Sequence, residues 1–326
     1  MEKKLFTIQS EKDGLVLDAA MFVPEGTIKG IFQISHGMAE HKERYFAYME
    51  FLASQGYVAV IHDHRGHGKS VKTEEDLGYF YDNRAEYIVE DVHQITQYMK
   101  NLYPDQQYIL FGHSMGSMVV RKYIKKYDAE IDQLIVCGSP SQNTMAGMGI
   151  ALARFLEIFK GARHRSSLIQ TLGLGSYSKN LGKGESQNAW ICSNADVVQQ
   201  YDESALCGFM FTLNGFQNLF RLMKEIYDKK GWNLQNPELP IFFVAGAEDP
   251  VIVNEEKWHQ SQQFLREIGY QNVSGKLYPK LRHEILNEDN KKEVYKDIIN
   301  APVQFPDCHT HRQPSRSFVL PVMNSV

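Results

Sequence analysis

The chain has 326 residues, of which 43% are hydrophobic and 23% are charged, and its formal net charge is -4. This length allows one α/β domain with an insertion or two domains, and the ordinary composition indicates a globular protein. The slightly acidic balance gives no reason to expect nucleic acid as a partner. No uninterrupted apolar segment reaches the ~18 residues of a membrane span.

Alternating apolar runs and amphipathic segments fill the first 140 residues. Asp13-Gly14 is a hairpin signal between two antiparallel edge strands. The elements expected after this hairpin are a strand at 30–35, a helix with its buried stripe at Phe46, Met49, Phe51 and Leu52, a strand in YVAVIH, a helix at 83–103, a strand ending at Phe111, a helix after Ser114, and a strand at 133–140. Such alternation predicts a mostly parallel sheet with helices on both faces.

The alternation stops after Pro140 and resumes at PIFFVAGAEDPV, 240–251. Between them lie helical segments at 148–160 and 208–228 and a Gly-rich polar stretch at 173–188, which we expect to be a flexible loop. A helix at 255–268, the strand GKLYPKL and a last helix at 288–300 follow. We therefore predict an α/β core formed by residues 1–139 and 237–300, a helical cap inserted at 140–236, and a Pro-rich, disordered tail at 301–326.

Four cysteines are far apart, without the CxxC pairing or spacing of a zinc site: Cys137, Cys192, Cys207 and Cys308. A reduced environment is the simpler interpretation, and the N-terminal MEKKLFTIQSEKDG is too polar for the apolar region of a signal peptide. The expected location is cytoplasmic. The sequence does not indicate an oligomeric state.

The stretch FGHSMGS places Ser114 between Gly112 and Gly116, directly after an apolar run and before an amphipathic helix. A serine hydroxyl becomes a useful nucleophile when a sharp strand-to-helix turn holds it where a base can take its proton. The flanking glycines permit this turn. Taken alone, the pattern is also compatible with an ordinary Gly/Ser turn of an α/β protein.

Two further residues follow strand ends in the order that an α/β-hydrolase requires. Asp249, in AGAEDPV, follows one expected strand, and His283, in LRHEILNE, follows the next. Separately they could be a turn aspartate and a solvated loop histidine. Together with Ser114 they form the sequence nucleophile, acid, base. We therefore predict a catalytic triad of Ser114, Asp249 and His283, with the N-H groups of Met115 and Met38 as the oxyanion hole.

Two other groups of polar residues are open to two interpretations. Glu40 and Arg44 are four residues apart, which predicts an exposed ion pair at the start of a helix. Because they adjoin the Met38 loop, they could instead face the alcohol portion of a substrate. Histidine-rich stretches occur at His62, His64 and His67 and, in the tail, at His309 and His311 beside Cys308. We interpret the first as a structural loop and expect no metal or cofactor at either.

Five motifs together resemble the monoacylglycerol lipase and lysophospholipase group of α/β-hydrolases: HGMAEHKERY, HDHRGHGKS, GHSMGS, GAEDPV and RHEILNE, spanning residues 36 to 288. The resemblance implies a serine hydrolase that cleaves fatty acyl esters of glycerol or lysophospholipids without a cofactor. It also implies a helical cap over the acyl chain, where Met145 and Phe209 could line an apolar channel or simply pack the cap onto the core. The cap is the expected place of any transient contact with a membrane surface.

Three alternatives stay open at this point. The triad is equally compatible with a short-chain or aryl carboxylesterase, or with a peptidase of the same branch. A ligand-binding protein on a hydrolase scaffold is a third possibility, although no expected catalytic residue is missing. The chain also departs from the family at its end, where a Pro-rich segment follows the last helix after about Asn300.

Overall fold

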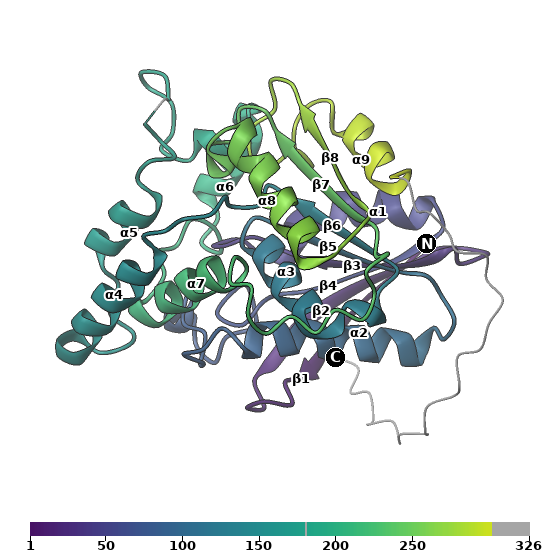
Figure 1. Cartoon of the computed structure of the whole chain (residues 1–326), viewed down its shortest axis with the longest axis horizontal. Coiled ribbons are helices and arrows are strands. Elements are labelled where there is room, and N and C mark those ends of the chain that lie inside the picture. The colour runs from purple at the N-terminus through teal and green to yellow at the C-terminus, as the bar shows by residue number, and fades with distance from the viewer. Residues whose placement is uncertain (180, 302–326) are drawn as a thin grey trace.

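A computed structural model describes residues 1–179 and 181–301 (Figure 1). The predicted tail therefore lies outside the described residues, apart from Ala301, and so does the histidine pair within it. Within the described parts of the chain, no helix combines the length and the apolar character needed to cross a membrane.

An eight-stranded sheet forms the centre of the described chain, with the order β1-β2-β4-β3-β5-β6-β7-β8. Its strands are β1 Glu2–Gln9, β2 Val16–Val23, β3 Gly30–Ser35, β4 Tyr57–His62, β5 Tyr108–His113, β6 Gln133–Cys137, β7 Ile241–Gly246 and β8 Val273–Tyr278. The β1 and β2 hairpin is antiparallel, as predicted, but only β1 is an edge strand, because β2 also pairs with β4 in antiparallel fashion. All other pairs are parallel. The predicted mostly parallel α/β fold is confirmed.

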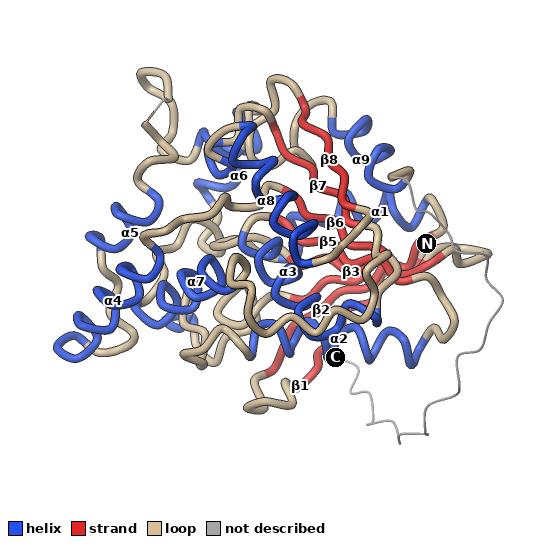
Figure 2. The backbone as a smooth tube through the Cα atoms, in the orientation of Figure 1, coloured by secondary structure: helices blue, strands red, loops and turns tan. Residues whose placement is uncertain are grey.

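Helices cover both faces of this sheet (Figure 2). One face packs against α2 Tyr87–Leu102, α3 Met115–Tyr127 and α8 Glu255–Ile268, and the other against α1 Phe46–Ser54 and α9 Lys291–Ile299. The side chains of β5 alternate between the two layers: Tyr108 and Leu110 join the first, and Ile109 and Phe111 join the second. This alternation explains the unbroken apolar run, because a strand buried on both faces needs apolar residues at every position.

Several helices differ from their predicted form: the helix expected at 208–228 spans only Leu213–Glu225, and the one expected at 288–300 spans Lys291–Ile299. α2 begins at Tyr87 instead of residue 83, because Ala85 has a φ of +55° and the Asp82 carboxylate accepts hydrogen bonds from the N-H groups of Glu86 and Tyr87. Side-chain acceptors of this kind satisfy the free N-H groups of a helix start. In α1 the fully buried aromatic residue is Tyr48, whereas Phe46 and Phe51 are only partly buried.

The segment between β6 and β7 contains α4 Ala146–Lys160, α5 Ser167–Leu174, α6 Ala195–Glu203 and α7 Leu213–Glu225. In Figure 1, α4, α5 and α7 lie together at one side of the sheet. α7 docks on the core with one apolar face, which includes Phe216, Leu219 and Phe220. Thr212 caps this helix by accepting a hydrogen bond from the N-H of Gly215 at 3.1 Å. We call residues 138–240 the inserted segment.

Candidate active site

Ser114 lies in a sharp turn between β5 and α3. Its φ of +53° and ψ of -118° are strained values for a residue with a side chain. A Cβ atom on Gly112 would lie 2.4 Å from the carbonyl oxygen of Gly116, and one on Gly116 would lie 2.0 Å from that of Ser35. Both glycines are therefore required for the turn, because the backbone approaches too closely for any side chain.

Asp249 and His283 meet at the carboxyl ends of β7 and β8. The Asp249 carboxylate binds His283 Nδ1 at 2.9 Å, and its other oxygen accepts a hydrogen bond from the N-H of Val251 at 2.8 Å. Both residues are buried, each 3% exposed. A carboxylate at Nδ1 orients the imidazole and leaves Nε2 available to accept a proton. Gly138, with a φ of +54°, leaves room for this ring, since a Cβ there would lie 3.1 Å from it.

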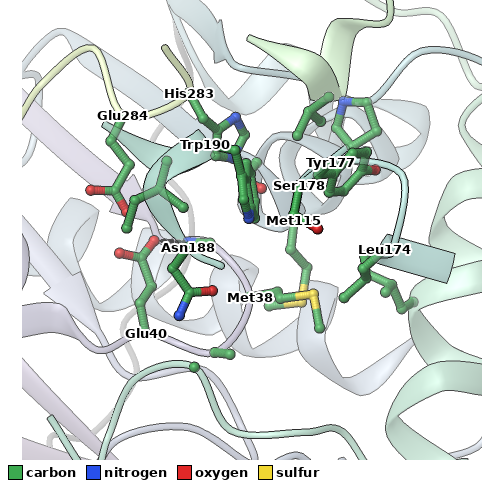
Figure 3. Close-up of a pocket in the computed structure, with 18 of the residues that line it drawn as sticks. Met38, Glu40, Met115, Leu174, Tyr177, Ser178, Asn188, Trp190, His283 and Glu284 are labelled. Carbon is green, nitrogen blue, oxygen red and sulfur yellow. Dashed lines mark hydrogen bonds between the residues drawn. The ribbon is translucent and has the colours of Figure 1, made fainter. Parts of the chain in front are cut away.

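A cavity of about 240 Å³ joins these residues to the inserted segment. Ser114 lines it. His283, Met38 and Met115, which are labelled in Figure 3, line it as well. Met115 is the first residue of α3, so its N-H has no acceptor within the helix. In Figure 3 the side chains of Met38 and Met115 lie side by side, although Met38 comes from the loop after β3 and Met115 from the start of α3. The residues that we predicted for the triad and the oxyanion hole are thus brought to one place.

Glu40 and Arg44 do not form the exposed ion pair that their spacing predicts. Glu40 is 3% exposed, and its carboxylate binds the Arg44 guanidinium at 2.6 Å. Arg44 also makes two hydrogen bonds, each of 2.6 Å, to the carboxylate of Glu284, which is next to His283. In addition, the N-H of Gly37 donates to Glu40 at 2.5 Å. Arg44 therefore links the loop of Met38 to the loop of His283.

The charges of this network are reflected in shifted pKa values. Burial alone would raise the pKa of the Glu40 carboxyl, but the hydrogen bond of His113 and the charge of Arg44 hold it well below its usual range. Burial likewise opposes the charged form of Arg44, yet the two carboxylates raise its pKa well above the ordinary value. The His113 ring responds in the same way, and Glu40 raises its pKa against the effect of burial. Glu40 is therefore ionised in the folded protein.

Only two of the four residues expected to bind substrate line the cavity. Glu40 and Phe209 line the cavity. Arg44 lies behind Glu40 and Glu284, in a much smaller hollow. Met145 precedes α4, is 56% exposed, and is not among the lining residues. The apolar wall is formed instead by side chains of other elements, including Pro140, Leu174, Leu219, Met223 and Val251.

Three histidines of the HDHRGHGKS stretch are fully buried behind the Met38 loop. The Ser35 hydroxyl is 2.9 Å from Nε2 of His64, and burial lowers the pKa of both His62 and His67 to about 3. The described residues contain no group of three or more His, Cys, Asp or Glu side chains placed to hold a metal ion. The three imidazole rings are therefore uncharged, whereas Asp63 and Arg65 of the same stretch form ion pairs with Lys42 and Asp91.

Comparisons with known proteins agree with this geometry. A family model described as "Serine aminopeptidase, S33" matches residues 26–290. A monoacylglycerol lipase of Mycolicibacterium smegmatis is 24% identical over 283 residues, which cover 86% of this chain and 90% of that protein. The human monoglyceride lipase is 34% identical over 107 residues, covering 33% of this chain and 34% of that protein.

The solved structures include a thermostable carboxyl esterase from Bacillus coagulans in complex with glycerol. It is 27% identical, the match covers 92% of this chain and 97% of that one, and the TM-score is 0.83. The family model spans most of the present chain, including β3 to β8 and the strand ends that carry Ser114, Asp249 and His283. The chain therefore belongs to the serine aminopeptidase S33 family of hydrolases and has the α/β-hydrolase fold.

Proposed function

We propose that the protein is a serine ester hydrolase that cleaves fatty acyl esters of glycerol or of lysophospholipids through an acyl-enzyme on Ser114. The observation that carries this proposal is the placement of Ser114 and of His283, bound to Asp249 at 2.9 Å, in one cavity. Part of the cavity wall is apolar, and part carries carboxylates. The names of the similar lipases and of the similar esterase support the same class of reaction.

In the acylation step, Nε2 of His283 takes the hydroxyl proton of Ser114 as its oxygen attacks the ester carbonyl carbon. Negative charge develops on the carbonyl oxygen, and the N-H groups of Met38 and Met115 donate hydrogen bonds to it. Each such donor typically contributes about 3 kcal/mol to the stability of the transition state. The imidazolium, oriented by Asp249, then gives its proton to the leaving alcohol as the ester C–O bond breaks.

In the deacylation step, water attacks the acyl carbon of the ester on Ser114. His283 takes one proton from this water and returns it to the Ser114 oxygen as the acyl bond breaks, so that the fatty acid leaves and the enzyme is regenerated. All of the chemistry uses side chains and backbone groups of this chain. The position of Asp249 keeps the base in the required tautomer throughout both steps.

The two ends of the cavity suit the two ends of such an ester. Leu174, Leu219 and Met223 provide an apolar wall from the inserted segment, which supports its role as a cap over the acyl chain. Glu40 and Glu284 provide carboxylate oxygens, and in Figure 3 their side chains approach each other at one end of the site. Carboxylates accept hydrogen bonds from alcohol hydroxyls, so this end is suited to a glycerol moiety.

The cap also carries an apolar surface suited to contact with a membrane. Large side chains of α4 and α5 are unusually exposed: Met148 is 60% exposed, Phe155 57%, Ile158 77%, Phe159 70% and Leu172 68%. The rings of Phe155 and Phe159 are in contact, with centroids 5.3 Å apart, and exposed apolar side chains that lie together mark interaction sites. We expect Phe159→Glu to weaken sedimentation with phosphatidylcholine vesicles and leave the turnover of a water-soluble acetyl ester unchanged. Equal sedimentation of both proteins would contradict this role.

The decisive experiment for the reaction compares wild-type protein with Ser114→Ala on a panel of monoacylglycerols and lysophospholipids. We expect the wild type to release fatty acid and the variant to lose this activity. A fluorophosphonate should label the wild type at Ser114 and not the variant. Comparable turnover by Ser114→Ala would falsify the assignment of the nucleophile.

A second candidate is a carboxylesterase for short acyl or aryl esters. The similarity to a carboxyl esterase that was solved with glycerol favours keeping this alternative. The acyl chain length separates the two proposals. A lipase should prefer decanoyl over acetyl p-nitrophenyl esters in kcat/KM, whereas a short-chain esterase should show the opposite order.

A further inference from the structure

A short part of the inserted segment, residues 189–194, runs beside the loop that carries His283, and we call it the strap. It begins with the 3-10 turn Ala189–Ile191. Arg282 donates a side-chain hydrogen bond to the carbonyl of Ala189 at 2.6 Å, and the N-H of Glu284 donates to the carbonyl of Ile191 at 2.6 Å. The strap therefore binds the residues immediately before and after His283.

Glu288 adds a second connection between the strap and the loop that carries His283, which we call the base loop. Its carboxylate is fully buried and accepts a hydrogen bond from the N-H of Arg282 at 2.9 Å. It also accepts hydrogen bonds from the N-H of Ser193, at 3.1 Å, and from the hydroxyl of Ser193. A buried carboxylate is costly unless donors surround it. Because these donors come from two distant parts of the chain, Glu288 holds the strap against the base loop.

Trp190, the second residue of the strap, contacts the His283 ring itself. The two ring centroids are 5.2 Å apart, with an angle of 41° between the planes. Tyr177 packs on the indole of Trp190, and these two ring centroids are 5.1 Å apart. Figure 3 shows Trp190 next to His283 at the cavity. The face of an indole attracts a nearby cation, and the imidazole of His283 becomes cationic each time it accepts a proton.

We propose that Trp190 is a positioning residue for the catalytic base and that the strap holds it in place. The inference rests on the proposed function, because it gives Trp190 a part in the proton transfers of His283. Trp190 restricts the imidazole to one orientation and favours its charged form during both steps. The inserted segment then contributes to the chemical step and not only to the binding of the acyl chain.

The test compares Trp190→Leu and Trp190→Phe with the wild type, and uses Trp232→Leu as a matched control. Trp232 packs on Phe264 and Tyr270, away from the cavity lining. We expect Trp190→Leu to lower kcat and kcat/KM by about tenfold, with KM nearly unchanged. The loss should be the same for acetyl and decanoyl p-nitrophenyl esters. Trp190→Phe should recover most of the rate, and Trp232→Leu should retain it.

A double-mutant cycle shows whether Trp190 acts through the base. In the His283→Ala background, Trp190→Leu should cause no further loss of the residual rate. The proposal is overturned if Trp190→Leu raises only the KM for the decanoyl ester, as a residue of the binding wall would, or if its effect is unchanged in that background.

Thermal unfolding separates misfolding from misplacement of the base. If Trp190→Leu does not fold, Ser193→Ala tests the strap without altering the cavity lining. The kcat of Ser193→Ala should fall severalfold, and an unchanged kcat would refute the proposal. Failure of the proposed function gives a different result, since wild-type protein would then neither hydrolyse esters nor react with a fluorophosphonate. A reactive wild type with an unimpaired Trp190→Leu variant overturns the strap proposal alone.

Discussion

Arg44 offers the sharpest test of how the two loops of the active site are held together. Its side chain is 12% exposed and lies between the carboxylates of Glu40 and Glu284, which are 4% and 6% exposed. Arg44→Met keeps an unbranched apolar stem but removes the positive charge. Both carboxylates would then be left buried without their cation.

The magnitude follows from this geometry. Removing one partner of a buried ion pair typically costs about 3–5 kcal/mol, because the remaining charge stays desolvated. Arg44 makes three hydrogen bonds of 2.6 Å to two carboxylates, so we expect a loss at the upper end of that range. For a chain of this size the loss lowers the Tm by roughly 10 °C. Arg44→Lys should lie between the wild type and Arg44→Met, since an ammonium cannot make the two parallel bonds to Glu284.

The assay is urea-induced unfolding followed by far-UV circular dichroism at pH 7. Lys229→Met is a suitable control, because Lys229 binds Glu267 at 2.9 Å in a pair whose side chains are 64% and 45% exposed. Exposed pairs contribute little to stability because water and salt screen them, so this variant should unfold almost like the wild type. If Arg44→Met loses less than 1 kcal/mol, the network does not hold the loops and our reasoning is wrong.

Three further predictions concern the turn, the buried histidine layer and the acid of the triad. Gly116→Ala places a methyl group 2.0 Å from the carbonyl oxygen of Ser35, so urea unfolding should show that the free energy of unfolding falls by about 3 kcal/mol or more. The control Gly147→Ala places its methyl group where no atom lies within 4 Å, so its free energy of unfolding should not fall. The pKa of His62 is about 3 in the folded protein but ordinary in the unfolded chain, so the unfolded state binds the extra proton and stability falls as the pH drops from about 6.5 towards 3. Between pH 6 and 4, His62→Leu should therefore remove about 1.4 kcal/mol per pH unit from the slope of the unfolding free energy against pH. An unchanged slope would contradict this. Asp249→Asn should keep the fold but leave the base in the wrong tautomer, so that kcat for a p-nitrophenyl ester falls by about 10⁴-fold, and a loss below tenfold would show that the carboxylate has no such part.

Elements with a strong local pattern could be predicted from the sequence. The strand at 30–35 and the helix at 255–268 have the predicted bounds in the structure. Both are defined by neighbours in the chain: a run of residues buried on both faces in the first, and an Asn254 cap followed by an amphipathic stripe in the second. The order of Ser114, Asp249 and His283 was readable for a related reason, because each follows a recognisable strand end.

Features that depend on distant partners could not be predicted in this way. The spacing of Glu40 and Arg44 correctly indicates an ion pair, but its burial depends on Glu284, which is 240 residues away from Arg44. Trp190 lies in a stretch without helical or strand periodicity, and its contact with the base becomes visible only when the inserted segment is folded onto the core. Met145 shows the opposite case, since an apolar residue at the start of α4 turned out to be exposed and outside the cavity wall.

The inserted segment also has a consequence for the order in which the protein can fold during synthesis. β6 is buried at every position and pairs with β7, yet about a hundred residues lie between Cys137 and Ile241. At a translation rate of about 5–20 residues per second, β6 remains an unpaired apolar edge for roughly 5–20 s after it emerges. Exposed edges of this kind promote aggregation. The nascent chain should therefore depend on chaperones most strongly in this interval, and a fragment ending at residue 239 should aggregate where the whole chain does not.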